Sequence, residues 1–132
     1  MPSIFTRIIQ GEIPGRILHE DDQCVAMLDI RPLHPGHTLV IPKQEIDQWT
    51  DLSADVVAHL TTVSHRIGQA QKRAIDCERI GLMIAGFEVP HVHVHVIPLR
   101  SMANLDFANA DVSPKADELD AMAELLRAAL TD

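Results

Sequence analysis

The segment Pro90-His-Val-His-Val-His-Val-Ile-Pro98 alternates histidine with valine over six residues. Successive side chains of a β-strand point to opposite faces, so this alternation predicts a strand with one valine face and one histidine face. The valines are expected to face the core, with the three imidazoles about 7 Å apart on the other side. A face exposed only to solvent would favour Thr, Lys or Glu, so the histidines indicate a functional site.

Neighbouring imidazoles are suited to two kinds of chemistry. A neutral ring nitrogen is a nucleophile or a metal ligand, and a protonated ring is a general acid near neutral pH. In a nucleophilic mechanism the middle histidine attacks phosphorus, while the flanking two bind phosphate oxygens or the leaving group. The second nitrogen of the nucleophile then needs a hydrogen bond, which a backbone carbonyl of the same strand can accept. In the alternative, the imidazoles share a zinc ion, although no fourth ligand is obvious.

The rest of the chain predicts an α+β fold around this strand. Strands are expected over 16–20, 24–29, 37–42, 80–85 and 92–99. Apolar residues at helical spacing follow Ser53, a good N-cap residue, and predict a long helix to about Ala74. Shorter helical patterns open the chain at 4–9 and close it after Ser113-Pro114, where Ser113 would cap the helix. Hairpin-length connections favour an antiparallel five-stranded sheet with one long helix and a C-terminal helix.

Length and composition limit the classes of protein that need consideration. The 132 residues suffice for one domain, and the formal net charge of −8 argues against a nucleic-acid polymer as partner. A small anion can still bind, because histidines and backbone N–H groups hold one or two phosphates. No apolar run is long enough to cross a bilayer and no secretory signal is evident, so a cytoplasmic protein without a membrane partner is predicted. Cys24 and Cys77 are expected to be reduced, since they form no CxxC motif.

The segment from Pro90 to Pro98 resembles the HxHxHxx signature of the histidine triad (HIT) family of nucleotide hydrolases and transferases. Further segments similar to that family are the opening 4–14, the hairpin turn 20–22, and the strands 28–32 and 35–42. Their order and spacing are nearest the Hint-like branch. The resemblance implies one HIT-like domain over 1–132, with a core at 3–98 and a C-terminal extension with a helix at 99–132. It also implies a homodimer whose two sheets join, with active sites near the seam.

The resemblance further implies roles for individual residues. His93 would be the nucleophile that becomes transiently nucleotidylated, with His91 and His95 beside it. His37 would complete the phosphate site, and Asp29 would hold the ribose hydroxyls. The apolar slot for the purine would be formed by Phe5, Ile8, Ile13, Ile30 and Leu39, with Val89 near the phosphate end. This mechanism requires neither a metal nor a cofactor.

The loop before the histidine strand departs from the family pattern. Family members carry an Asn on the preceding strand and a glycine-rich loop that ends in Gly-Gln-Ser or Gly-Gln-Thr. Here the region 83–90 is several residues shorter, and Ala85, Phe87 and Glu88 take the places of the Asn, the Gln and the hydroxyl residue. A carboxylate near a phosphate pocket repels a second or third phosphate unless it points away or is protonated by burial.

Several other polar residues are expected to have no part in the chemistry. His34 is predicted to be a loop residue, and His59 and His65 to be solvated positions of the long helix. Ser3 and Thr6 replace the cysteine pair of some relatives, so the structural zinc site of those relatives is not expected. The segment 100–111 has no pattern that decides whether it covers the site or the dimer seam.

Three functional hypotheses follow. The first is a nucleotide hydrolase or transferase that attacks the α-phosphorus of a nucleoside phosphoramidate, an acyl nucleotide or a dinucleoside polyphosphate through a nucleotidyl-His93 intermediate. The second is a nucleotide-binding or regulatory protein with weak or no turnover, consistent with the changed loop at 85–88. The third is a metal-binding protein that uses the histidine cluster.

Overall fold

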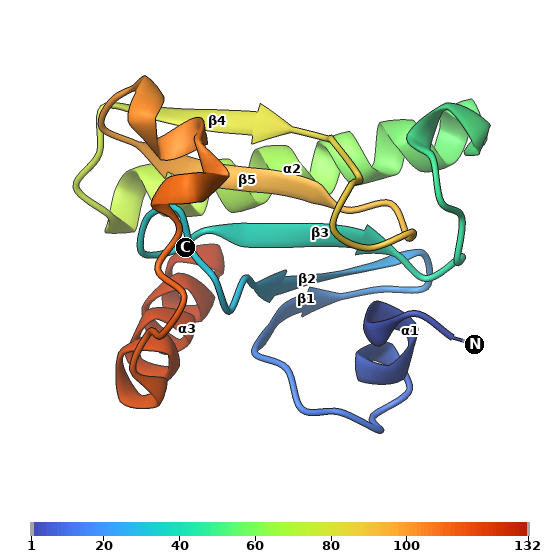
Figure 1. The fold of residues 1–132 in the computed structure, drawn as a ribbon, viewed down its shortest axis with the longest axis horizontal. Coiled ribbons are helices and arrows are strands. Elements are labelled where there is room, and N and C mark those ends of the chain that lie inside the picture. Colours follow the sequence, from blue (N-terminus) through green and yellow to red (C-terminus); the bar gives the residue numbers. More distant parts are fainter. Residues whose placement is uncertain (1, 132) are drawn as a thin grey trace.

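The computed structural model describes residues 2–131, and its five strands form one antiparallel sheet (Figure 1). The strands are β1 (Ile17–Glu20), β2 (Cys24–Leu28), β3 (Thr38–Pro42), β4 (Arg79–Met83) and β5 (Val94–Leu99). Their order in the sheet is β1-β2-β3-β5-β4, with each neighbouring pair antiparallel. The predicted α+β class and the five-stranded antiparallel sheet are therefore confirmed.

Three α-helices accompany the sheet: α1 (Ile4–Ile9), α2 (Ala54–Ala74) and α3 (Ala116–Leu130). The helix α2 begins after Ser53, whose hydroxyl accepts a hydrogen bond from the Val56 N–H, so the predicted cap and bounds are confirmed. The predicted Ser113 cap of α3 is wrong. Lys115 is the N-cap residue and has extended backbone, and the helix begins only at Ala116.

Both strands around the histidine motif are shorter than predicted. The strand expected over 80–85 ends at Met83, and the one expected over 92–99 begins at Val94. The ladders end where Val94 pairs with Val40 and where His95 pairs with Met83. Before that point the Val92 N–H donates to the carbonyl of Ile46, so loops rather than strands hold the chain there.

The two faces of the sheet carry different clusters of side chains. On one face the valines of the motif pack with Cys24, Ala26 and Val40 against α2, through Leu60, Val63 and Ile67. On the other face Val25, Met27, Leu39 and Ile41 pack against Phe5 of α1. The helix α3 packs with Ala123 and Leu126 on Leu28. The valines therefore face the core as predicted, while the site must lie on the α1 side.

The two histidines in the middle of α2 have different surroundings. His65 is exposed, as predicted. The prediction that His59 is merely solvated is wrong, since its side chain is only 30% exposed and its Nε2 lies 2.8 Å from Oδ2 of Asp21. The turn between β1 and β2 brings Asp21 against this part of α2. None of the helices within residues 2–131 has both the length and the apolar character needed to cross a membrane.

Candidate active site

Four buried histidines gather at one end of the apolar face. His91 and His93 lie just before β5, His95 lies on it, and His37 directly precedes β3. None of the four is more than 2% exposed. The ring of Phe5 contacts the His93 ring edge-on, with the centroids 5.0 Å apart. The fold thus brings together the four imidazoles that were expected to form the site.

The hydrogen bonds of His93 determine which of its nitrogens is reactive. Its Nδ1 lies 2.7 Å from the backbone carbonyl oxygen of His91. A carbonyl oxygen only accepts hydrogen bonds, so Nδ1 carries the proton, and in the neutral ring Nε2 keeps a free lone pair. The predicted hydrogen bond to a backbone carbonyl is confirmed, but His91 and His93 lie just before β5 rather than on the strand.

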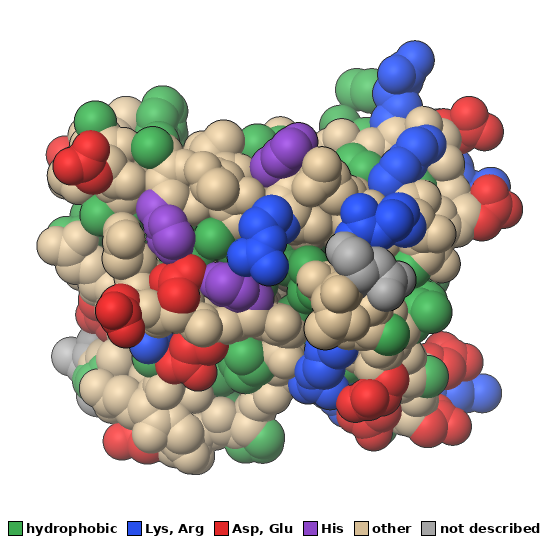
Figure 2. Space-filling view, turned by 180° about the vertical axis from the view of Figure 1, so that it is seen from behind, with side chains coloured by type: hydrophobic (Ala, Val, Ile, Leu, Met, Phe, Trp, Pro, Cys, Tyr) green, Lys and Arg blue, Asp and Glu red, His purple; other side chains and the backbone are tan. Residues whose placement is uncertain are grey.

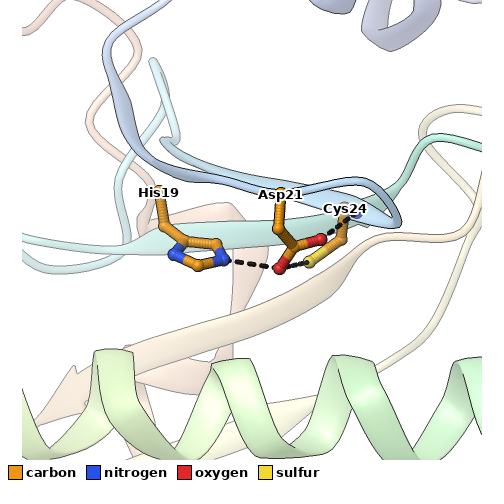
Figure 3. A group of neighbouring side chains, drawn as sticks. All are labelled: His19, Asp21 and Cys24. Atoms are coloured by element: carbon orange, nitrogen blue, oxygen red, sulfur yellow. Dashed lines mark hydrogen bonds and ion pairs between the residues drawn. The ribbon is translucent and has the colours of Figure 1, made fainter.

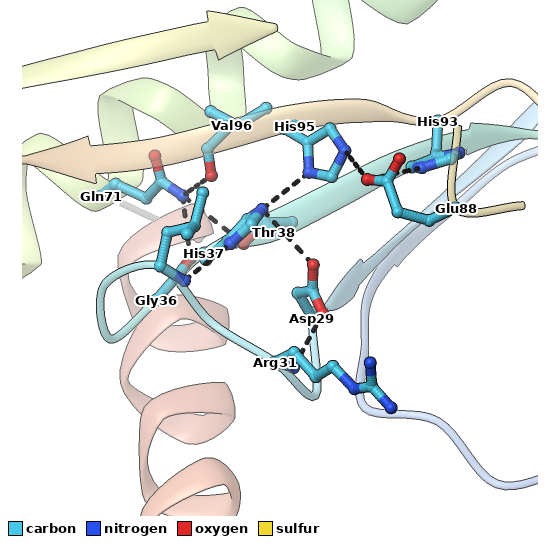
Figure 4. Close-up of polar contacts among 11 residues, drawn as sticks. Asp29, Arg31, Gly36, His37, Thr38, Gln71, Glu88, His93, His95 and Val96 are labelled. Atoms are coloured by element: carbon cyan, nitrogen blue, oxygen red, sulfur yellow. Dashed lines mark hydrogen bonds and ion pairs between the residues drawn. The ribbon is translucent and has the colours of Figure 1, made fainter. Parts of the chain in front are cut away.

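A second chain of hydrogen bonds orients His37 and His95 (Figure 4). The Leu33 N–H donates to Nδ1 of His37 at 3.0 Å, so the proton of this ring is on Nε2. His37 then donates from Nε2 to Nδ1 of His95 at 2.9 Å, which leaves the proton of His95 on its own Nε2. This Nε2–H is buried and has no hydrogen-bond partner among the described residues. It is therefore a ready donor for an oxygen of a bound ligand.

Burial keeps these imidazoles neutral. It lowers the pKa of His37 to about 3 and that of His95 to about 4, and the neighbouring imidazoles add to both effects. Burial also lowers the pKa of His91, against the opposing effect of its hydrogen bond to the Pro42 carbonyl. Neutral rings at pH 7 agree with the proton positions deduced from the hydrogen bonds.

The lowered pKa values predict that the protein loses stability as the pH falls from 7 to 5. In the unfolded chain a histidine takes up its proton near pH 6.5, whereas folded His37 and His95 do so only near 3 and 4. The unfolded state binds more protons in this window, so the free energy of unfolding falls by about 2 kcal/mol for each ring. Denaturant unfolding of the wild type and of His37→Asn at both pH values tests this. A pH dependence that is the same in both proteins would contradict it.

A buried glutamine of α2 holds the loop that carries His37. Gln71 Nε2 donates to the carbonyl oxygens of Gly36 and Val96, each at 2.9 Å (Figure 4). Gly36 has a φ of +95°, a value that favours glycine, at the turn into β3. Gln71 therefore ties the start of β3 to β5, and with it His37 to His95. The helical pattern of α2 gave no signal for this role.

Glu88 points into the site rather than away from it (Figure 4). Its Oε1 lies 3.5 Å from Nε2 of His95 and 4.0 Å from Nε2 of His93. The preceding Phe87 is 97% exposed, so it makes no contact in place of the family's glutamine. Gly86, with a φ of +88°, provides the turn before these two residues. A carboxylate thus occupies the space in front of both imidazoles.

An apolar cleft of about 510 Å³ runs from the histidines toward α1. Its walls include the five apolar residues that the family resemblance assigned to the slot, together with Val89, which it placed near the phosphate end: Phe5, Ile8, Ile13, Ile30, Leu39 and Val89. Asp29, Glu88, His93 and His95 also line it, whereas His37 and His91 are not among the lining residues. His37 therefore acts on the cleft through His95, not as a direct part of its wall.

The segment after β5 closes one side of this cleft. Phe107, Ala110 and Val112 line it, and the Phe107 ring lies 5.3 Å from the ring of His95. Phe107 belongs to a single 3₁₀ turn, Phe107–Asn109, whose spacing in the sequence predicts no contact with a distant strand. Within 100–111, Phe107 and Ala110 therefore contribute to the cleft.

Asp29 lies at the edge of the cleft between β2 and the loop before β3. Its Oδ1 accepts a hydrogen bond from the Arg31 N–H at 2.8 Å, and its Oδ2 lies 3.5 Å from Nε2 of His37. Burial raises the pKa of this carboxyl, against the effect of the Arg31 hydrogen bond. The Oδ2 atom has room for a further hydrogen-bond donor, such as a ligand hydroxyl.

His91 anchors the segment that leads into α1. Its Nε2–H donates to the Pro42 carbonyl at 2.8 Å, so its Nδ1 accepts from the hydroxyl of Ser3, 2.6 Å away. Oε1 of Glu45 accepts from the Ser3 N–H and from the Thr6 hydroxyl, at 2.6 Å each. Ser3 and Thr6 thus join a hydrogen-bond network that fixes α1 over the cleft. His91 therefore stabilises the site through these hydrogen bonds and does not line the cleft.

An antiparallel sheet with buried, oriented imidazoles at the mouth of an apolar cleft defines a small α+β domain suited to a ligand with an anionic and an apolar part. Residues 10–102 match the family model described as "HIT domain", and the chain belongs to this family of nucleotide-binding, hydrolase-like histidine triad proteins.

Three similar proteins illustrate the range of the family. An uncharacterized HIT-like protein of Mycobacterium tuberculosis is 36% identical over 98% of this chain and 94% of that protein. The adenylylsulfatase HINT3 of Arabidopsis thaliana is 35% identical over 74% of this chain and 52% of that protein. A crystal structure of a hypothetical histidine triad nucleotide-binding protein from Sulfolobus tokodaii superimposes with a TM-score of 0.83 at 26% identity, covering 96% of this chain and 91% of the other.

Proposed function

We propose that the protein is a nucleotide hydrolase or nucleotidyltransferase in which Nε2 of His93 attacks the α-phosphorus of its substrate. The observation that carries this proposal is the 2.7 Å hydrogen bond from Nδ1–H of His93 to the His91 carbonyl, which leaves the Nε2 lone pair free on the cleft side. The substrate class is a nucleoside phosphoramidate, an acyl nucleotide or a dinucleoside polyphosphate.

The reaction has two displacement steps. In the first, the Nε2 lone pair of His93 forms a bond to phosphorus, the bond to the leaving group breaks, and the leaving group takes a proton from solvent. In the second, water or another acceptor attacks phosphorus, the bond to Nε2 breaks, and the proton returns to solvent. The Nε2–H of His95, which has no hydrogen-bond partner among residues 2–131, donates to a phosphate oxygen and stabilises the charge that develops there.

The remaining walls of the cleft suit the nucleoside. The Oδ2 atom of Asp29 is placed to accept from ribose hydroxyls, and the apolar walls suit the base. Apolar residues from α1 and β3, such as Phe5 and Leu39, pack together and form part of these walls. This arrangement supports a substrate whose phosphate end lies at His93 and whose base lies toward α1.

A metal ion at the histidines is disfavoured by the proton positions. The Leu33 N–H fixes the proton of His37 on Nε2, and this in turn fixes the proton of His95 on its cleft-facing nitrogen. A metal ligand needs a lone pair at that nitrogen. His95 could therefore bind a metal only if the hydrogen bond to His37 were broken.

The nucleotide-binding alternative has one observation in its favour, which is the Glu88 carboxylate in front of His93 and His95. A single-turnover experiment with an α-labelled nucleotide separates the two functions. Acid-labile label on the wild-type protein is expected for the enzyme. Measurable nucleotide binding without label for any of the three substrate classes would support the binding protein instead.

We also infer that the protein forms a homodimer through β4. This strand is an edge of the sheet, and Leu82 on it is 56% exposed. Pairing with a second copy would satisfy the free backbone groups of the edge. Leu82→Lys is expected to shift the molecular mass measured by light scattering from dimer to monomer. Leu125→Lys, at an exposed leucine of α3, is the control, and a monomeric wild type would contradict the inference.

A further inference from the structure

A second group of metal-binding side chains lies on the opposite face of the sheet from the candidate active site. His19, Asp21 and Cys24 come from the β1–β2 hairpin and project toward the side on which α2 lies (Figure 3). His59 of α2 contacts the same aspartate. The view from behind shows histidine and acidic side chains next to one another on this side of the molecule (Figure 2).

Three of these side chains contact the fourth, Asp21. Oδ2 of Asp21 lies 2.7 Å from Nε2 of His19, 2.8 Å from Nε2 of His59 and 3.6 Å from Sγ of Cys24. The ligand atoms of His19, Asp21 and Cys24 all lie within 4.8 Å of one another. Separations of this size are found between the ligands of one metal ion. His59 contacts this group through Asp21 alone, so its ring must turn toward the ion to become the fourth ligand.

Backbone hydrogen bonds hold the aspartate in place for such a role. The other carboxylate oxygen, Oδ1, accepts from the backbone N–H of Gln23 at 2.8 Å and of Cys24 at 2.9 Å. These bonds fix the orientation of the carboxylate and leave Oδ2 directed at the cluster. Metal-binding carboxylates are commonly supported by outer hydrogen bonds of this kind.

The two histidines can change their proton positions, unlike those of the active site. No hydrogen bond to Nδ1 of His19 or of His59 occurs within residues 2–131, and both rings are partly exposed, at 20% and 30%. Each ring can therefore move its proton to Nδ1 and offer the lone pair of Nε2 to a metal.

The charges of the cluster also suit a divalent ion. Its acidic side chains are the carboxylate of Asp21 and the thiol of Cys24, which becomes a thiolate when it binds a metal. A thiolate, a carboxylate and a divalent cation together are neutral, which makes a partly buried site favourable.

We propose that His19, Asp21, Cys24 and His59 form a closed, four-ligand zinc site that fastens the β1–β2 hairpin to α2. Two imidazole nitrogens, one sulfur and one carboxylate oxygen are a donor set that zinc accepts in tetrahedral geometry. On binding, the S–H bond of Cys24 breaks, a zinc–sulfur bond forms, and the proton passes to solvent. The site is structural, because its four protein ligands leave no position for a substrate.

Cobalt(II) substitution tests the proposal, because a thiolate ligand produces a charge-transfer band that histidine and carboxylate ligands do not. The full-length protein, freed of metal by a chelator, is titrated with Co²⁺ alone and then with Zn²⁺. One equivalent of Co²⁺ is expected to produce the thiolate band, and one equivalent of Zn²⁺ is expected to remove it. The absence of a thiolate band in the wild-type protein would overturn the proposal.

Matched variants identify the ligands. Cys24→Ser should abolish the band and Cys77→Ser, at the other cysteine, should retain it. His59→Gln should weaken Zn²⁺ binding at least about 10²-fold, whereas His65→Gln, at an exposed position of the same helix, should not change it. Because Cys24 is fully buried, Cys24→Ser alters the packing of the core as well as the ligand set, so His59→Gln is the deciding variant. Unchanged Zn²⁺ affinity in His59→Gln would overturn the four-ligand site.

Discussion

His93→Asn is expected to lower kcat/KM by at least about 10⁴-fold and to abolish the covalent nucleotidyl intermediate. Asparagine is close in size to the part of the ring that donates to the His91 carbonyl, 2.7 Å away, so it can keep that hydrogen bond. It offers no nucleophilic nitrogen to the cleft. The loss should therefore appear in the chemical step, and the dissociation constant of a nucleoside monophosphate should change by less than about tenfold.

The control for this variant is His65→Asn, which changes an exposed histidine on α2 outside the site. It should keep wild-type activity, and both variants should keep the wild-type melting temperature within a few degrees. Single-turnover labelling and steady-state kinetics measure the two effects. If His93→Asn retained more than a tenth of the wild-type rate, His93 would not be the nucleophile.

The histidine strand was predictable because the His/Val alternation has the same two-residue repeat as the side chains of a β-strand. Alternation of His with Val places the valines against α2 and the imidazoles on the other face, without information from distant parts of the chain. The bounds of α2 were predictable for a similar reason, since Ser53 supplies a local N-cap. In both segments the sequence pattern and the structure that it determines are local, and the prediction and the structure agree.

The contacts that complete the site depend on segments that are distant in the sequence. His37 orients His95 only because β3 and β5 pair with Leu39 opposite His95, a register that no local pattern encodes. Phe107 reaches the same ring from a 3₁₀ turn after β5. His59 was assigned to solvent because a helical pattern cannot show that a hairpin turn lies against it.

The contacts that the sequence did not predict involve loops whose positions depend on tertiary contacts. The hairpin turn contacts α2 and the segment after β5 contacts the loop before β3, so their side chains meet partners that their own sequence does not specify. Asn104 illustrates this, because its side-chain amide donates to the Leu33 carbonyl at 3.2 Å. Leu33 belongs to the loop before β3, and its N–H fixes the proton of His37 on Nε2.

Glu88→Gln is expected to raise kcat/KM for a dinucleoside polyphosphate by about 10²-fold. The Glu88 carboxylate lies 3.5 Å from Nε2 of His95 and 4.0 Å from Nε2 of His93, where the phosphate oxygens of a substrate must lie. Two like charges about 4 Å apart near a protein surface repel by about 4 kcal/mol. Because the side chain is 42% exposed and can turn aside, we expect about two thirds of this effect to appear as a rate difference.

Comparison of two substrates separates charge repulsion from proton donation by Glu88. A nucleoside phosphoramidate with an uncharged leaving group brings fewer negative charges to the site, so Glu88→Gln should raise its kcat/KM by less than about tenfold. If Glu88 acts by charge repulsion, Glu88→Gln must therefore raise the ratio of kcat/KM for the polyphosphate to kcat/KM for the phosphoramidate. Glu118→Gln, at an exposed position on α3, should leave this ratio unchanged. If Glu88→Gln instead lowered both rates, the carboxyl would be a proton donor to the leaving group, and the repulsion argument would be wrong.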